Sequence, residues 1–175
     1  MKTPHAFKAA AAGLLALLLA SPAAQAHVGI VATPARAGDE VRIAFQVGHG
    51  CGDSPTVALT VQVPEGLLLG RPMVKPGWTI ATQDRRLDLP FVRHGIAFTQ
   101  SMALVHWNGG SLPGALFDEF VIKGIVSEQA RGSLAFPVLQ VCQNGQQYDW
   151  SGAADSAQPA PLLEIEPGRH PRPRP

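Results

Sequence analysis

Apolar and polar residues alternate along two stretches of this 175-residue chain, and this alternation constrains the fold more than any other feature. Residues 41–47 (VRIAFQV) and 57–63 (VALTVQV) place an apolar side chain at every second position, which is the pattern of a half-buried β-strand. Composition and flanking turn residues predict further short strands at 78–80, 96–99, 102–106, 120–126, 134–141, 147–150 and 162–166. No segment after residue 26 carries an apolar stripe of period 3.6. We therefore expect an all-β fold of about nine short strands, most simply an immunoglobulin-like β-sandwich and otherwise a barrel.

The first 26 residues have the parts of a secretory signal. Lys2 and Lys8 precede an apolar run at 9–20 (AAAAGLLALLLA). The segment AQA at 24–26 then places small residues where signal peptidase cleaves. The run is shorter than the about 20 residues that span a bilayer, which disfavours the alternatives of a membrane anchor or a buried helix. We expect cleavage after Ala26, a periplasmic or secreted protein, and no membrane span in the mature chain.

The part that remains after cleavage is long enough for one domain. We expect this domain at residues 27–167 and a disordered tail at 168–175 (GRHPRPRP), whose composition is too poor in apolar groups to pack. Two of the 14 basic residues lie in the signal, so 12 basic residues face 13 acidic ones in the mature chain. This balance offers no basic face for nucleic acid.

Both cysteines, Cys51 and Cys142, lie in the exported part of the chain. Two thiols in an oxidising compartment usually pair, so we expect a disulfide. The alternative is a thiolate site for Cu(I) or zinc, with His49 two residues before Cys51. Such a site needs a reduced state, which export disfavours.

Cleavage after Ala26 would make His27 the N-terminal residue. Its α-amine and ring Nδ1 would then form a chelate suited to Cu(II), which prefers tetragonal nitrogen and oxygen donors. Zn(II) is the lesser candidate. The alternative is that His27 merely ends the chain in a solvated, mobile segment.

Two other residues are candidates for a site on the strength of their sequence context. Glu119 lies in FDEF at 117–120, where flanking phenylalanines would partly desolvate a carboxylate and favour a nearby cation. Its alternative role is a charge that protects an edge strand. The indole of Trp150 would favour a cation over its face, and its alternative role is core packing.

Seven motifs follow one another in the mature sequence: HV at 27–28, GHGCGDSPT at 48–56, VPEG at 63–66, PGW at 76–78, HWNGGSLP at 106–113, FDEF at 117–120 and WSGAAD at 150–155. By the number and order of these motifs, the sequence resembles the YcnI-like family of exported copper-binding domains. The resemblance implies an immunoglobulin-like sandwich in which one N-terminal histidine binds Cu(II), a glutamate completes the coordination and a tryptophan lies beside it. Carried over by motif, these roles fall on His27, Glu119 and Trp150, with Asp118 as the neighbouring carboxylate.

The resemblance extends to the cysteine pair, which many members share, but not to the C-terminal membrane-spanning segment of many members. Its leading implication is a non-enzymatic copper-binding protein that holds or delivers Cu(II) for copper homeostasis, with copper-trafficking proteins as partners. One alternative is a copper-dependent oxidative enzyme, which would use a second histidine such as His106, although a lone histidine is more often a surface residue. Another is a metal-free, partner-binding sandwich, because one fold hosts many functions.

Overall fold

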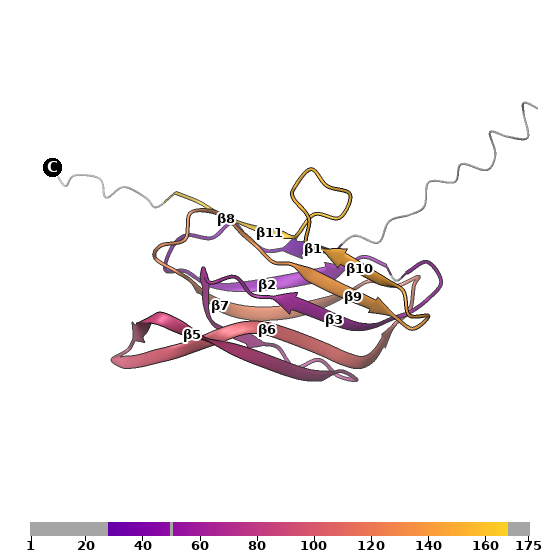
Figure 1. Cartoon of the computed structure of the whole chain (residues 1–175), viewed down its shortest axis with the longest axis horizontal. Helices are drawn as coiled ribbons and strands as arrows, with labels where there is room; N and C mark the ends of the chain where they lie inside the picture. Colours follow the sequence, from indigo (N-terminus) through magenta and orange to yellow (C-terminus); the bar gives the residue numbers. More distant parts are fainter. Residues whose placement is uncertain (1–27, 50, 168–175) are drawn as a thin grey trace, which may run out of the picture.

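The computed structural model describes residues 28–49 and 51–167, and these residues form an all-β sandwich, as the sequence predicts (Figure 1). The strands of the described part are β1 (Val28–Val31), β2 (Glu40–Val47), β3 (Thr56–Gln62), β4 (Leu67–Pro72), β5 (Thr79–Arg93), β6 (Ile96–Leu112), β7 (Asp118–Val126), β8 (Gly132–Ala135), β9 (Val138–Cys142), β10 (Gln147–Trp150) and β11 (Leu162–Ile165). His27 and the tail at 168–175 lie outside the described residues.

Two antiparallel sheets face each other. The four-stranded sheet has the order β1-β2-β7-β4, and the five-stranded sheet has the order β10-β9-β3-β6-β5. The backbone N–H of Leu69 in β4 donates to Ser101 Oγ in β6 at 3.1 Å, so these two strands lie on the same side of the sandwich. The opposite edges, β1 and β10, therefore flank the other side. A third, two-stranded sheet pairs β8 with β11.

The core between the sheets follows the alternation of the sequence. Ile43, Phe45 and Val47 of β2 are fully buried, as the period-two pattern predicts. The ring of Phe120 in β7 makes T-shaped contacts with two tryptophan rings, whose centroids lie 4.9 Å (Trp78) and 5.4 Å (Trp107) from its own. Burial of apolar surface drives the packing of the two sheets, and aromatic groups such as these contribute large areas to it.

One end of the sandwich gathers the start of the described chain and the cysteines. Val28 at the start of β1 pairs with Val47, and Val47 pairs with Asp118 at the start of β7. Cys51 follows β2 closely and forms a disulfide with Cys142, the last residue of β9. We call this region, defined by these five residues, the N-terminal end of the sandwich.

A long ribbon made of β5 and β6 runs along the other side of the molecule (Figure 1). Its strands are joined by His94 and Gly95, which have φ of 50° and 77°, as a two-residue hairpin turn with positive φ at both positions requires. Arg93 next to the turn contacts Glu40 of β2 at 3.3 Å. The end of the ribbon therefore reaches the outer face of the four-stranded sheet.

The structure corrects the predicted strand list in several places. Segments 96–99 and 102–106 belong to one strand, β6, and segment 78–80 is the start of the much longer β5. Segment 134–141 is two strands in different sheets, because β8 ends before Phe136-Pro137 and β9 begins after it. β1 and β4 were not predicted. Within the described residues, the chain has no helix of the length and apolarity needed to cross a membrane.

Candidate metal centre

The described chain begins on a firmly packed strand. Val28 is 1% exposed, belongs to the hydrophobic core and pairs with Val47 of β2. His27, the predicted metal ligand, precedes Val28 directly but lies outside the described residues. The structure thus fixes the residue that follows the predicted ligand, and the coordination by His27 stays a prediction.

Trp150 lies in the core between the two sheets. It ends β10, where its backbone pairs with Val138 of β9, and its side chain is fully buried. The ring of Tyr148 stacks on it with centroids 6.3 Å apart and an interplanar angle of 15°. Trp150 shares the hydrophobic core with Val28, so the predicted indole and the start of β1 belong to the same packed unit. Trp150 therefore packs in the core, which was the alternative role given for it, and its position beside a metal stays a prediction.

Glu119 lies on the outer face of the four-stranded sheet. Its neighbour Phe120 points into the core with no exposure, and successive side chains of a strand point to opposite faces. The Glu119 side chain is 34% exposed and has its Oε2 3.7 Å from an Arg42 guanidinium nitrogen. The carboxylate therefore already has a cationic partner, at a distance and exposure typical of a weak surface ion pair.

β7 is not an edge strand of its sheet, because it lies between β2 and β4. Its pairing with β4 ends at Ile122, so at Glu119 only the β2 side of β7 is paired, and the alternative role of Glu119 as a protecting charge stays a prediction. The neighbouring carboxylate, Asp118, is 2.6 Å from Lys75 Nζ and accepts a hydrogen bond from the backbone N–H of Glu119 at 2.7 Å. Lys75 also donates to the backbone oxygen of Glu119 at 2.9 Å and lies 4.4 Å from the centre of the Phe120 ring. Lys75 thus contacts three consecutive residues at the start of β7.

The structure does not bring Glu119 and Trp150 together. Trp150 comes from the five-stranded sheet and is buried between the sheets, whereas the Glu119 carboxylate is on the outer face of the four-stranded one. The FDEF motif in the sequence reveals two strand faces but not which of them faces the core. Since Phe120 takes the core position, Glu119 must point away from it.

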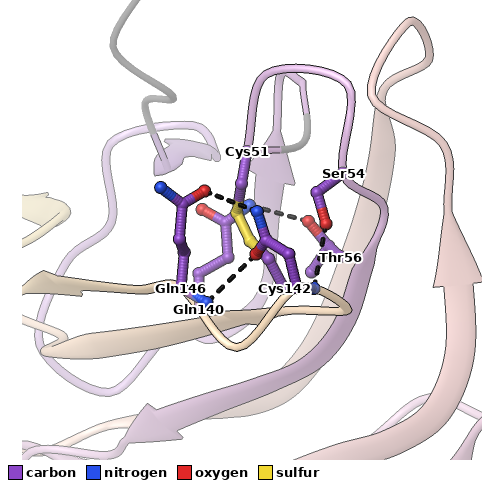
Figure 2. Close-up of a disulfide and its surroundings, with 7 residues drawn as sticks. Cys51, Ser54, Thr56, Gln140, Cys142 and Gln146 are labelled. Atoms are coloured by element: carbon purple, nitrogen blue, oxygen red, sulfur yellow. Dashed lines mark hydrogen bonds between the residues drawn. A yellow bond between two sulfur atoms is a disulfide. The ribbon is translucent and has the colours of Figure 1, made fainter.

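The predicted disulfide joins Cys51 to Cys142, with Cα atoms 6.2 Å apart, at the N-terminal end of the sandwich (Figure 2). This pairing is confirmed, and it leaves neither sulfur as a free thiolate for Cu(I) or zinc. The alternative site with His49 is therefore excluded in the oxidised protein.

Gln140 is a buried polar residue that sequence reasoning missed. It lies two residues before Cys142 on the inner face of β9, is fully buried, and donates from Nε2 to Thr56 Oγ1 at 2.7 Å (Figure 2). Its Oε1 is buried and has no hydrogen-bond partner among the described residues. Its backbone pairs with Tyr148, whose ring stacks on Trp150. The sequence does contain a signal, since Gln140 occupies a core-facing position of the strand run VLQVC.

The other histidines of the described part do not gather into a second ligand set. His106 lies on the outer face of the five-stranded sheet, because Trp107 takes the core position, and its Nδ1 is 2.7 Å from Thr60 Oγ1. His94 is in the turn of the β5–β6 ribbon, whereas His49 lies between the end of β2 and Cys51. Residues 28–49 and 51–167 contain no group of three or more His, Cys, Asp or Glu side chains placed to hold a metal. A metal site at the N-terminal end would thus need donors from outside this range.

Comparison with known proteins assigns the family. The model of a family described as "Domain of unknown function (DUF1775)" matches residues 27–165, a range that includes every described strand. The chain belongs to the DUF1775 family. This family is the YcnI-like family that the sequence motifs resemble, and its description names no function. No curated protein matches the sequence.

Among solved structures, the DUF1775 chain is similar to an uncharacterized protein from Nocardia farcinica with an immunoglobulin-like fold. That similarity has a TM-score of 0.59 and 25% identity and covers 79% of this chain and 97% of the other. It is also similar to a cohesin module of a Clostridium perfringens family 33 glycoside hydrolase, at a TM-score of 0.46 and 7% identity over 81% and 98% of the two chains. A non-cellulosomal cohesin from Archaeoglobus fulgidus gives 0.40 and 16% over 81% and 93%. The first of these supports the immunoglobulin-like fold, and the two cohesins are too distant to carry an argument.

Proposed function

We propose that this DUF1775 protein is an exported copper-binding protein that holds or delivers Cu(II) through an N-terminal histidine. The observation that carries the proposal is the anchoring of β1. This strand begins at Val28, directly after His27, and Val28 is buried and paired with Val47. Cleavage after Ala26 would thus leave a single residue ahead of a rigid strand, in place of the mobile end that chain termini usually form. The family match also begins at residue 27.

A short, anchored N-terminus suits a chelate. The α-amine and the ring Nδ1 of His27 would supply two nitrogen donors, which Cu(II) prefers. An α-amine has an ordinary pKa of about 7.7 to 8.0 and must lose its proton to bind a metal, so copper affinity should rise with pH through this range. Because β1 is ordered before the metal arrives, binding would cost less conformational entropy than on a frayed end.

Two side chains are candidates for the oxygen ligand. Glu119 is the one that the family resemblance implies, but its carboxylate faces outward and is paired with Arg42. Gln140 offers a buried amide oxygen without a partner among the described residues, next to the disulfide and to the Tyr148–Trp150 stack. A buried polar atom without a partner costs free energy, and a ligand that supplies the missing contact removes that cost.

The test of the proposal is a Cu(II) titration of two proteins with different N-termini. One begins at His27, and the other carries one additional alanine ahead of His27, which turns the α-amine into an amide. We expect one tightly bound copper for the first protein, followed by electron paramagnetic resonance and by quenching of tryptophan fluorescence, and at least about tenfold weaker binding for the second. Equal affinity of the two proteins would refute the chelate.

The oxygen ligand is tested on the protein that begins at His27. Glu119→Leu and Gln140→Leu each remove one candidate oxygen ligand while keeping the side chain close in size. Asp149→Asn, a change at an exposed acid beside Trp150, is the matched control. The variant of the ligating residue should bind copper about tenfold more weakly than the control. If both variants bind as the control does, neither residue is a ligand.

A further inference from the structure

A cavity of about 210 Å³ lies between the end of the β5–β6 ribbon and the outer face of the four-stranded sheet. Its apolar walls come from three strands. Leu69 of β4 and Ile125 of β7 form the sheet side, and Ile96 and Phe98 of β6 form the ribbon side. This cavity lies away from the N-terminal end of the sandwich, and none of the proposed copper ligands lines it.

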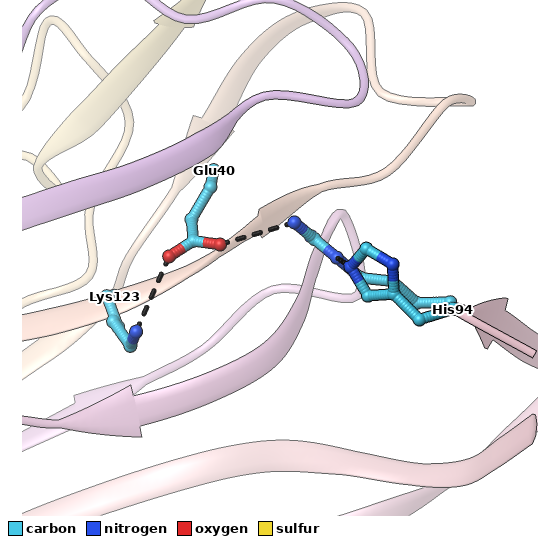
Figure 3. A network of polar contacts seen from close by, with 4 residues as sticks. Glu40, His94 and Lys123 are labelled. Atoms are coloured by element: carbon cyan, nitrogen blue, oxygen red, sulfur yellow. Dashed lines mark hydrogen bonds and ion pairs between the residues drawn. The ribbon is translucent and has the colours of Figure 1, made fainter. Parts of the chain in front are cut away.

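The polar rim of the cavity has a surplus of positive charge. Arg71, Arg93 and Lys123 line it together with a single carboxylate, Glu40, and the ring of His94. The oxygens of Glu40 lie 3.3 Å from Arg93 and 3.4 Å from Lys123, so this carboxylate pairs with two of these cations. Figure 3 shows Glu40 and Lys123 pointing toward each other. One carboxylate thus serves two cations, and Arg71 has no ion pair with any described residue in the structure. A cation without an ion pair beside an apolar wall attracts an anion more strongly than a cation in open water does.

The backbone around the cavity is unusual in a second, independent way. In the described residues, Leu69 and His94 have positive φ although they are not glycine, each at 50°, and both line the cavity. The hairpin turn explains His94. Leu69 has no such turn, and a bulky residue with positive φ is a genuine outlier. It lies where the pairing of β4 with β7 is interrupted between Leu68 and Arg71. Such irregularities redirect side chains and are frequent beside binding sites.

From these observations we propose that the cavity binds a small organic carboxylate with an apolar body. The apolar part packs against Leu69, Ile96, Phe98 and Ile125, and the carboxylate takes the place beside Arg71 that no protein carboxylate fills. At about 210 Å³ the cavity is smaller than most pockets for drug-sized ligands, which favours a small acid. Arginine is the best suited of the cationic side chains to such a ligand, because its planar fork matches a carboxylate.

The proposal is tested by NMR titration of the mature protein without added copper and at low ionic strength. Hexanoate carries both features of the ligand, acetate has only the charge, and hexanol has only the apolar chain. We expect hexanoate to shift the amide resonances of Gly95, Gly124 and Ile125 in a saturable manner and to bind at least tenfold more tightly than acetate or hexanol. Equal affinities for hexanoate and hexanol would overturn the proposal, because the cations would then contribute nothing.

Three variants test the role of the charges. Arg71→Gln should weaken hexanoate binding three- to tenfold, whereas Arg86→Gln should leave it unchanged, because Arg86 lies on the same ribbon but does not line the cavity. Glu40→Gln should strengthen binding about threefold, because Arg93 and Lys123 lose their internal competitor. If Glu40 served only to hold the cavity in shape, Glu40→Gln would instead weaken hexanoate binding. If Arg71→Gln and Arg86→Gln bind hexanoate equally, or if Glu40→Gln weakens binding while the melting temperature is unchanged, the proposal is wrong.

Discussion

Removal of the disulfide by the double change Cys51→Ala and Cys142→Ala should cost this fold a large part of its stability. The bond links residues that are 91 positions apart, so it closes a long loop in the unfolded chain. The chain-entropy relation for a loop of this length gives an entropy loss of about 15.6 cal/mol/K, or about 4.6 kcal/mol at 298 K. Since domains are stable by only about 5 to 15 kcal/mol, the double variant should be close to the limit of folding.

The measurement is urea unfolding followed by tryptophan fluorescence, since Trp107 and Trp150 are fully buried and should report on the loss of the core. Three samples are compared: the oxidised protein, the same protein reduced with dithiothreitol, and the double alanine variant. With a urea slope of about 2 kcal/mol/M, the loss of 4.6 kcal/mol corresponds to a midpoint lower by about 2 M. The reduced protein separates the loss of the cross-link from the loss of the two buried sulfur atoms.

The result that would refute the reasoning is a loss below about 1 kcal/mol in both the reduced protein and the variant. The unfolded chain would then already be restricted near these residues, or the bond would strain the native state by nearly as much as it stabilises it. If the variant alone is destabilised, packing of the sulfur atoms matters and the cross-link does not.

Two further substitutions, each with a control substitution at another site, test the packing of the core. Phe120→Ala, which removes a fully buried ring from between Trp78 and Trp107, should cost about 3 to 5 kcal/mol in urea unfolding, whereas Phe117→Ala at an exposed site should change the stability by less than about 0.5 kcal/mol. A similar cost for the two would contradict the assignment of the core face of β7. Gly110→Ala would place a Cβ 2.1 Å from the Trp78 ring, so the variant should be destabilised and should show altered near-ultraviolet circular dichroism. Gly29→Ala meets nothing within 4 Å and should leave that spectrum unchanged. Equal stabilities and identical spectra of these two glycine variants would contradict the close packing of Trp78 against Gly110.

Local alternation was sufficient to predict the central strands. Six of the eight expected core residues in 41–47 and 57–63 are buried, because each segment lies inside a sheet with one face on the core, whereas Val41 and Val57 are only partly buried. The register irregularity between Thr56 and Ala58 is not visible in the alternation, and it buries Thr56 where Val57 was expected. Pairing with β6 and β9 thus overrides the local pattern at one residue.

The long ribbon escaped prediction because little of it is buried. β5 contains charged residues and Pro90, and its apolar alternation is confined to the short stretch 87–91, which the proline interrupts. β5 is held in place by pairing with β6, and this pairing is interrupted between Arg86 and Phe91, around Pro90. Pairing between segments is a property of two stretches of sequence together, and neither of them reveals it alone.

Composition and order of residues by themselves determined the all-β class, the expectation of a disulfide and the family resemblance, because each depends on residue types, local periodicity or motif order. The faces and neighbours of the candidate site were decided by the tertiary structure. FDEF shows that Glu119 and Phe120 point to opposite sides, but only packing against Trp78 and Trp107 makes Phe120 the inward one and directs Glu119 outward to Arg42. The buried Gln140 oxygen and the cationic cavity likewise depend on strands distant in sequence, since burial and charge balance arise when separate segments share one space.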